Sequence, residues 1–215
     1  MSREKKPGNW LPMKDGTNQL QIRQTVLERA HQQPATLQLA RVDGGSPPAP
    51  LDPAQFARGL DLAGGIVVGA ISQFLVWTQS FQSHAHEIRE LDPKLLTFAQ
   101  GDPNTRYCYS YWELGPDDAF VVAFTPPECE YWNLQIGNHW LESLDFENHR
   151  THVNHHTATA RPDGSVRIVV ARRDPGVDDW LDTAGHARGG LALRFVGAAE
   201  LPETHTRVVP IAELA

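Results

Sequence analysis

The spacing of apolar side chains changes along the chain from a helical period to a strand period. Between residues 53 and 81 apolar residues recur every three to four positions, which predicts one long amphipathic helix. Asp52 and Pro53 predict its start, because an aspartate side chain can cap the first turn and the missing proline N–H costs nothing there. We expect the aromatic stripe of this helix to pack against a sheet, with a kink near Gly64.

The uncharged run 62–71 (LAGGIVVGAI) inside this helix raises the question of a membrane span. A spanning helix needs about 20 consecutive apolar residues. This run is bounded by Asp61 on one side and by Ser72 and Gln73 on the other. We therefore interpret it as a buried helix and expect no membrane partner.

The first 50 residues carry shorter patterns. Leu20 and Ile22 alternate as in a short strand, and residues 26–30 have helical spacing until Pro34 ends the helix. Residues 36–42 are predicted to form a second short strand. The segment 44–50 (GGSPPAP) is a loop by composition.

After residue 102 the alternation has a period of two, which is typical of strands. Three strands joined by short connections favour an antiparallel meander and are predicted at 106–114, 119–125 and 129–136. Further strands are predicted at 155–161, 165–172, 190–196 and 206–209. The fold class is therefore α+β, mainly an antiparallel β-sandwich with an N-terminal helical region packed on it. We expect a helical and short-strand region at 1–101 and a sandwich domain at 102–215, in one structural unit.

Composition limits the classes of protein to which the chain can belong. A chain of 215 residues with 40% hydrophobic and 21% charged residues is typical of a globular protein. A net charge of −7 argues against nucleic acid as the partner, because that binding needs clustered Lys and Arg. The N-terminal charges are followed by Pro7, Gly8 and Asn9 where the apolar part of an export signal would begin, so we expect a cytoplasmic protein.

The stretch 130–156 holds the densest set of chemically active side chains. On the predicted strand 129–136, Tyr131, Asn133 and Gln135 share one face. If the three tyrosines of the strand 106–114 lie on the same side, the two sets form an aromatic, hydrogen-bonding platform. Such a surface suits sugars, aromatic rings and other flat polar ligands. The alternative is a sheet face that simply meets solvent.

The loop that follows supplies candidates for catalysis. Asp145 and His152 are the acid–base candidates, since histidine titrates near neutrality and a carboxylate can fix its tautomer. Trp140 and Tyr131 are candidate stacking surfaces, and Arg150 is a candidate anchor for an anion or hydroxyl group. The full set of predicted substrate-binding residues is Tyr131, Asn138, His139, Trp140, Arg150, Asn154, Trp180, Asp182 and His186.

Five of the ten histidines fall in the same stretch, but their spacing does not favour a metal site. On an extended segment His152 and His156 would lie about 13 Å apart at about 3.3 Å per residue. Ligand bonds to one ion are near 2 Å, so only one of the two could bind it. Help from elsewhere, such as His139, His149 or His186, would then be needed, so a metal enzyme stays a third hypothesis. The prediction from the sequence is no metal ligand and no cofactor.

The segment 173–189 (RDPGVDDWLDTAGHARG) is the second informative stretch. Asp178 or Asp179 could cap one helical turn that holds Trp180, and Gly185 could end it. Asp182 and His186 are four residues apart, which allows a pair in a helical turn. The alternative is a loop held in the sandwich by Trp180.

The combination YWNLQIGNHWLESLDF, HVNHHTA, DPGVDDWLDTAGH and GGLALRF resembles the domain-of-unknown-function family 1214. The opening GNWLP, LQIRQ and PATLQLARVD resembles the segment that precedes that domain in many relatives. The resemblance implies a jelly-roll-like sandwich with accessory helices and no established activity. Relatives often carry a 1254-type domain ahead of this one, so the chain resembles a compact form without that partner or a piece of a larger protein.

The sequence thus favours a cytoplasmic protein that binds a small polar or carbohydrate-like ligand, with turnover left open. The site would be built from the loop 138–156 and the segment 174–186, which must then meet in space. The alternative is a non-catalytic module that packs against a partner protein, a partner domain or a second copy of the chain. A pocket where Asp145, Arg150 and His152 converge would favour the first hypothesis, and these side chains splayed into solvent beside a flat exposed aromatic patch would favour the second.

Overall fold

The computed structural model describes residues 2–17, 20–40, 50–98 and 101–214. Contacts divide the chain into two compact units, Met1–Val42 and Asp43–Ala215. The division falls well before residue 102, because the long helix and the strands after it belong to the same unit.

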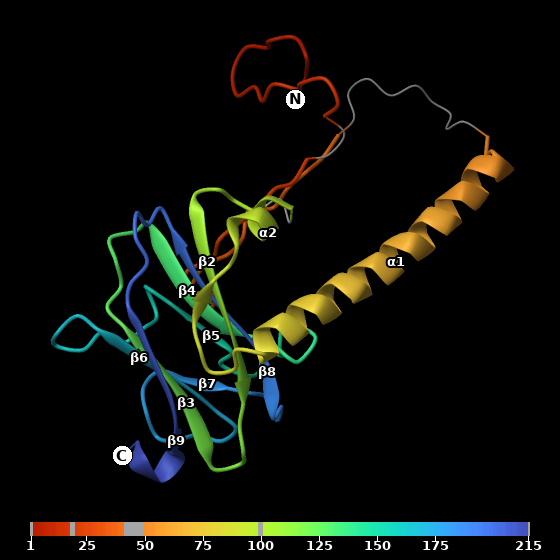
Figure 1. The fold of residues 1–215 in the computed structure, drawn as a ribbon. Coiled ribbons are helices and arrows are strands. Elements are labelled where there is room, and N and C mark those ends of the chain that lie inside the picture. The colour runs from red at the N-terminus through yellow and green to blue at the C-terminus, as the bar shows by residue number, and fades with distance from the viewer. Residues whose placement is uncertain (1, 18–19, 41–49, 99–100, 215) are drawn as a thin grey trace. The chain divides into compact units, whose positions relative to one another are not determined.

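The larger unit is built on two packed sheets of mostly antiparallel strands, which together form an open sandwich rather than a closed barrel (Figure 1). The first sheet has the order β1-β2-β8-β4-β5, and its strands are Arg89–Glu90, Thr105–Glu113, Arg188–Val196, Tyr131–Ile136 and His152–Asn154. The second has the order β7-β6-β3-β9, and its strands are Trp180–Asp182, Val166–Ala171, Asp118–Phe124 and Thr204–Pro210. The α+β sandwich predicted from the sequence is confirmed.

The order of strands within each sheet differs from the predicted meander. Strands β2, β3 and β4 follow one another in the chain, yet β2 and β4 both pair with β8 while β3 lies in the other sheet. The prediction of a three-stranded meander is wrong. Short connections allow a chain to cross between the two layers of a sandwich as readily as to turn within one layer, and the alternating pattern is the same in both cases.

The core lies between the two sheets. It consists of the inward-facing residues of both sheets, among them Trp112, Phe120, Phe124, Trp132, Leu134, Ile168, Leu193 and Phe195. Phe124 meets Trp132 edge to face at 5.1 Å between ring centroids, which is a favoured aromatic geometry. The indole N–H of Trp112 donates to the Gly190 carbonyl at 3.1 Å, so this large buried side chain leaves no polar group unpaired.

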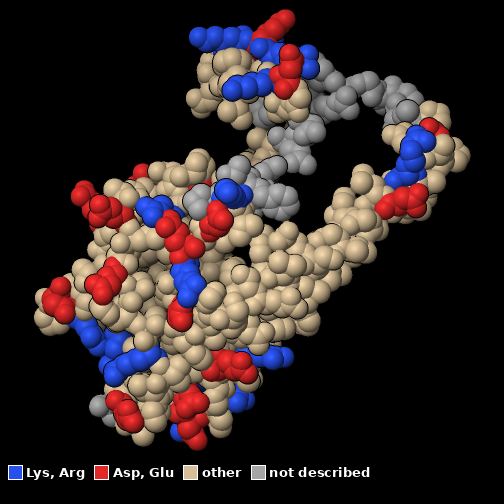
Figure 2. Space-filling model, viewed as in Figure 1, with Lys and Arg blue, Asp and Glu red and all other residues tan. Residues whose placement is uncertain are grey.

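Helix α1 (Pro53–Gln82) begins as predicted, with the Asp52 carboxylate accepting from the Ala54 N–H at 2.9 Å. It runs unbroken through Gly64. The prediction that its apolar run is buried is wrong, because Thr78 is the buried residue of the helix and the whole span 53–72 is exposed. The last turns pack on β2, where the Phe81 ring stacks on Tyr109 at 4.8 Å. Figure 2 shows a long stretch of this helix without charged residues.

The helices and strands predicted outside the main strands agree less well with the structure. Residues 20–40 contain no helix or strand, so the strands predicted at 20–22 and 36–42 and the helix at 26–30 are wrong as far as these residues are described. Residues 41–49, which hold most of the predicted loop, lie outside the described part of the chain. The expected helical piece before residue 100 is α2 (Pro93–Phe98), and a 3-10 turn, Ile211–Glu213, follows β9.

Two predictions in the second half of the chain need correction. The strand expected at 155–161 is replaced by turns, and the short strand β5 lies just before it. The helical turn expected around Trp180 is strand β7, which pairs in parallel with β6. The parallel neighbour β6, where Val169 pairs with Trp180, decides this conformation, and the spacing of apolar residues within the segment does not reveal it.

Candidate functional site

The outer face of the first sheet carries a row of tyrosine and amide side chains. Strands β2 and β4 flank β8, where Tyr107 and Asn133 both pair with Arg194, and Tyr109 and Gln135 both pair with Ala192. Because residues opposite one another in a sheet point to the same side, these side chains share one face. The platform suggested by the sequence therefore forms. We call Tyr107, Tyr109, Tyr131, Asn133, Gln135 and Arg194 the sheet-face cluster.

Arg194 lies at the centre of the sheet-face cluster. Its guanidinium lies 5.9 Å from the centroid of the Tyr107 ring and donates to Gln135 Oε1 at 3.2 Å. Burial raises the pKa of the Tyr109 hydroxyl, and the charge and hydrogen bond of Arg194 oppose that shift. A cation held over an aromatic ring and beside an amide provides donors in a fixed plane.

The far side of the cluster is closed by β5 and the turn after it. Tyr131 meets His155 edge to face at 5.3 Å. Burial raises the pKa of Tyr131, and a hydrogen bond with Asn154 opposes the shift. Asn154 is buried, and its Oδ1 accepts from the N–H groups of His156 and Thr157. Asn154 thus shapes this turn as well as contacting Tyr131.

A second group of predicted residues lies where the end of α1 meets the sheet. Tyr111 and His139 share a hydrogen bond of 2.6 Å between the phenol oxygen and Nδ1, and Thr78 donates to the His139 carbonyl at 3.0 Å. Burial lowers the pKa of His139, and the charge of Arg188 lowers it further. Trp140 beside it is 52% exposed. His139, which is anchored by the buried Tyr111, therefore supports the local structure here.

Asn138 holds the tight turn that presents this group. Its Oδ1 accepts from the Trp140 and Glu142 N–H groups, and its Nδ2 donates to Glu142 Oε2 at 2.7 Å. Leu141 has a φ of 62°, a left-handed conformation that costs energy for a residue with a branched side chain. The surrounding hydrogen bonds hold the turn in place. Asn138 is therefore engaged within the chain.

A third group joins the loop 138–156 to the segment 174–186. His149 Nδ1 lies 2.7 Å from Asp182 Oδ2, and the Asp182 N–H donates to the Arg150 carbonyl at 2.8 Å. Arg150 donates to Asp179 Oδ1 at 2.8 Å and to the Asp178 carbonyl. The prediction that these two segments meet in space is confirmed. A histidine–carboxylate hydrogen bond of this kind can hold a proton for acid–base chemistry.

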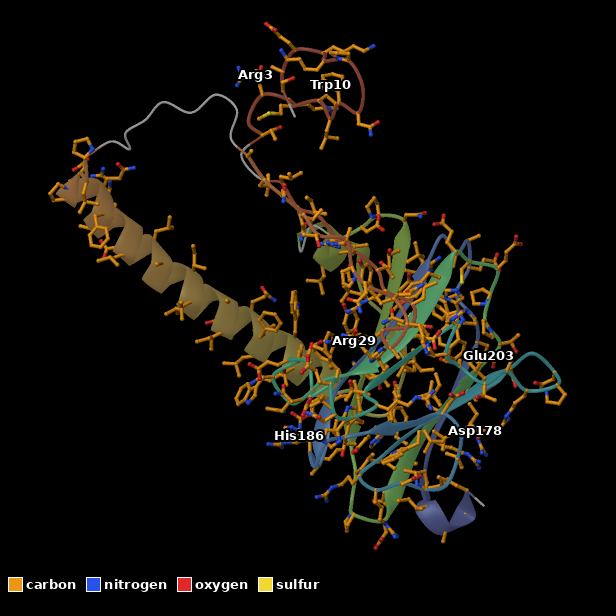
Figure 3. All side chains as sticks on the ribbon, turned by 180° about the vertical axis from the view of Figure 1, so that it is seen from behind. Arg3, Trp10, Arg29, Asp178, His186 and Glu203 are labelled. Carbon is orange, nitrogen blue, oxygen red and sulfur yellow. The ribbon has the colours of Figure 1, made fainter. Side chains whose placement is uncertain are left out.

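The partners in this third group differ from the predicted ones. Asp182 bonds to His149 and caps the Ala184 N–H, while His186 closes a backbone turn on Thr183 and is exposed. Trp180 donates its indole N–H to the Ala171 carbonyl and packs against the apolar cluster that includes Val169. Figure 3 shows Asp178 and His186 well apart, at either end of the segment that contains β7. Asp182 ends β7 and a turn at residues 184–185 follows it, so the helical turn that would have paired Asp182 with His186 does not form.

The acid–base candidates Asp145 and His152 lie in different local settings. The Asp145 carboxylate accepts from the amide of Asn148 at 2.8 Å and from two backbone N–H groups. The side-chain hydrogen bond from Asn148 holds the pKa of Asp145 below its usual value. His152 is exposed on β5, opposite Gln135. Asp145 therefore acts as the cap of its own turn, and its pairing with His152 stays a prediction.

The contacts thus divide the predicted site residues into separate groups rather than one pocket. Among the described residues no three His, Cys, Asp or Glu side chains gather to hold a metal ion. A hollow in the described structure is lined by other residues, Gln24, Thr25, Val26, Gln32, Gln33 and Pro34. The sheet-face cluster is the group that brings aromatic, amide and cationic side chains onto one surface.

Three residues of these groups escaped the sequence-based prediction: Arg194, His149 and Asp179. Arg194 is embedded in an apolar strand pattern, and only the position of β8 between β2 and β4 places it among tyrosines. Asp179 was considered only as a helix cap, although its burial to 2% and its bonds to Arg150 and the Thr159 N–H make it the link between two loops. The alternating pattern of β8 was the signal that could have shown that Arg194 points away from the core.

Comparison with known families identifies most of the second half of the chain. Residues 113–200 match the model of a family described as a protein of unknown function, DUF1214. The chain contains a DUF1214 region. The resemblance recognised from the sequence motifs is therefore confirmed, and the DUF1214 region spans the strands β3 to β8 with both loops of the third group. No curated protein matches the chain.

Two solved structures resemble the chain. An uncharacterized protein from Burkholderia cenocepacia is 40% identical, with a TM-score of 0.81, and the match covers 87% of this chain and 52% of that protein. The chain thus spans about half the length of that protein. A protein from Vibrio parahaemolyticus is 19% identical with a TM-score of 0.40, over 52% of this chain and 33% of that one.

Proposed function

We propose that the sandwich binds a small, flat, polar ligand on the outer face of its first sheet, through the sheet-face cluster. The observation that carries the proposal is the position of Arg194, between the Tyr107 ring and the Gln135 amide. Tyr107 and Tyr131 offer aromatic surfaces, whereas the Tyr109 ring is already stacked on Phe81. Amide and guanidinium groups offer directed hydrogen bonds. Sugars and sugar acids combine a flat apolar face with hydroxyl or carboxylate groups, and they fit this set.

The proposed site differs from the one predicted from the sequence, which lay in the loop 138–156 and the segment 174–186. Arg150 is engaged by the buried Asp179, and Asp145 caps a turn, so neither is the anchor that a ligand would need. Arg194 takes the anchoring role instead, because its guanidinium can donate to a ligand carboxylate or hydroxyl while it keeps its bond to Gln135. Binding alone is proposed, with no reaction.

The test is a calorimetric titration of the full chain with neutral sugars, sugar acids and aromatic acids. A ligand of this class should bind, and Arg194→Gln should weaken its binding at least about tenfold, equivalent to one charge-assisted hydrogen bond of about 1.5 kcal/mol. Arg207 lies exposed on β9 in the other sheet, so Arg207→Gln is the matched control and should leave affinity unchanged. Equal affinities for the two variants would contradict the proposal, as would a screen without binding.

A second function is supported by a different surface. The apolar side chains along α1 are exposed, and large exposed apolar patches are typical of surfaces that contact another protein. We propose accordingly that the chain is also an interaction module. This function needs no ligand on the sheet face, so the two proposals are independent.

A further inference from the structure

The single charged side chain of the sheet-face cluster has no carboxylate partner. Among the described residues, no Asp or Glu forms an ion pair with Arg194. Other arginines of the larger unit do have such partners, at 2.6 to 2.8 Å, and these are Arg89, Arg106, Arg150 and Arg173. Arg207 on β9 is exposed, so water can surround it, but Arg194 is partly buried. The charge of Arg194 therefore lies among neutral groups.

The register of the sheet decides which neutral groups surround Arg194. Ala192 lies two residues before it on β8 and so on the same face, and its side chain is only a methyl group. Tyr109 and Gln135 are the cross-strand neighbours of Ala192. The guanidinium leans along β8 towards them, bonding to the Tyr109 hydroxyl and to Gln135 Oε1 at 3.2 Å. With the Tyr107 ring at 5.9 Å, these groups orient the guanidinium without neutralising it.

The guanidinium keeps donors for a ligand. It has five N–H groups, and its bonds to Gln135 and Tyr109 occupy only part of this set. A charge that is partly removed from water is stabilised when it is paired. A carboxylate fits the remaining donors well, because its two oxygens match two parallel guanidinium N–H groups.

The tyrosine hydroxyls beside Arg194 can donate to the same anion. Burial raises the pKa of Tyr109 and of Tyr131, so both hydroxyls are protonated at neutral pH. The Tyr109 oxygen accepts from Arg194, which leaves its own O–H to donate. Hydrogen bonds to a charged acceptor are roughly twice as strong as bonds between neutral groups. The donors of the cluster therefore favour an anion over a neutral ligand.

Other charged ligands fit the cluster less well. Phosphate sites combine several cationic side chains or use the N-terminus of a helix, whereas the sheet-face cluster lies on strands and has one cation. A divalent metal ion needs carboxylate, thiolate or imidazole ligands, and the cluster contains none of them. The net charge of the chain is −7, so selection of an anion here depends on the local charge of Arg194.

We propose that the ligand of the sheet-face cluster is a small organic acid, whose carboxylate is bound by Arg194 and whose ring or hydroxyl groups lie against the neutral side chains of the cluster. The inference rests on the proposed ligand site and names the charge of its ligand. Sugar acids and aromatic acids both have this chemistry, and neutral sugars do not.

The test compares organic acids with their neutral counterparts by calorimetric titration of the full chain at neutral pH. The pairs are glucuronate with glucose, galacturonate with galactose, and benzoate with benzyl alcohol. In at least one pair the acid should bind at least about tenfold more tightly, which corresponds to one charge-assisted hydrogen bond. The pair that shows this preference distinguishes a sugar acid from an aromatic acid.

Variants at Arg194 assign the preference to its guanidinium. Arg194→Gln should remove the preference for the acid. Arg194→Lys should retain a smaller preference, because an ammonium group keeps the charge without the paired N–H groups. Arg207→Gln, in the other sheet, is the matched control and should retain the full preference. Circular dichroism checks that each variant is folded.

Three outcomes would overturn the inference. Equal affinities for acid and neutral compound in every pair that binds, both lowered by Arg194→Gln, would leave the proposed ligand site intact and show that it does not select charge. A preference for the acid that persists unchanged in Arg194→Gln would place the anion elsewhere. Binding by none of the compounds would contradict the ligand site as well. The comparison on the unchanged chain needs no variant, so it decides the question of charge even if Arg194→Gln fails to fold.

Discussion

Asp179 shows how one buried carboxylate can fix two loops. It accepts hydrogen bonds of 2.8 Å from Arg150 and from the Thr159 N–H, and its neighbours Asp178 and Trp180 lead into β7. A carboxyl group at 2% exposure is tolerated because both of its oxygens are paired. The pairing with Arg150 therefore joins the loop before β5 to the strand β7 at the edge of the sandwich.

We expect Asp179→Ala to lower the free energy of unfolding by about 2 kcal/mol, because it leaves a charged Arg150 and a buried N–H without their acceptor. Arg150 is 39% exposed and can regain water, which keeps the loss below that of a fully buried pair. Urea denaturation followed by tryptophan fluorescence measures the change. The exposed neighbour Asp178 is the control, and Asp178→Ala should change stability by less than about 0.5 kcal/mol. Equal losses would mean that the pairing is not the source of the effect.

At the scale of elements, α1 is attached to the sandwich by its last turns only. Phe81 stacks on Tyr109 with an angle of 12° between the rings, and Thr78 is buried against His139. The first five turns contribute no buried residue. The strength of the attachment therefore depends on a small number of side chains near residue 80.

Phe81→Ala should destabilise this attachment by about 2 kcal/mol, from the loss of apolar burial and of the ring contact. The same substitution on the same helix at the exposed Phe56 should have almost no effect. Thermal unfolding of the two variants, compared with the unchanged chain, gives the measurement. A larger loss for Phe56→Ala than for Phe81→Ala would show that the free end of α1 is covered in solution.

At the scale of the whole molecule, stability should be uneven between the sandwich and α1. The central strands β3 and β8 each have a neighbour on both sides and lie against the core. The helix from 53 to 72 has backbone hydrogen bonds but no buried side chains. Local opening is easiest where few apolar contacts hold an element.

Native-state hydrogen exchange should therefore find the slowest amides in β3 and β8, and much faster exchange in residues 56–72. The exchange must be measured on the chain alone at low concentration, because self-association would slow the exchange of the α1 amides. A dilution series serves as the control. Protection in α1 equal to that in β3 at every concentration would contradict this picture of the free chain.

The sequence by itself determined the elements whose signals are local. The alternation of apolar residues located β2, β3, β4, β6, β8 and β9, and the Asp52-Pro53 pair located the start of α1. The face of Tyr131, Asn133 and Gln135 also followed from alternation alone. Side-chain period and helix capping depend on residues next to one another in the chain, so they can be read without knowing the fold.

Only the tertiary structure decided which elements are neighbours and what they expose. It placed β3 in the opposite sheet from β2 and β4, brought Arg194 between two rows of polar and aromatic side chains, and made Trp180 part of a strand. It also left residues 53–72 of α1 exposed, although their apolar pattern matches that of a buried helix. Strand pairing and side-chain burial depend on residues far apart in the chain. The apolar periodicity of a helix indicates that its apolar side chains need to be buried, but it does not indicate which surface buries them.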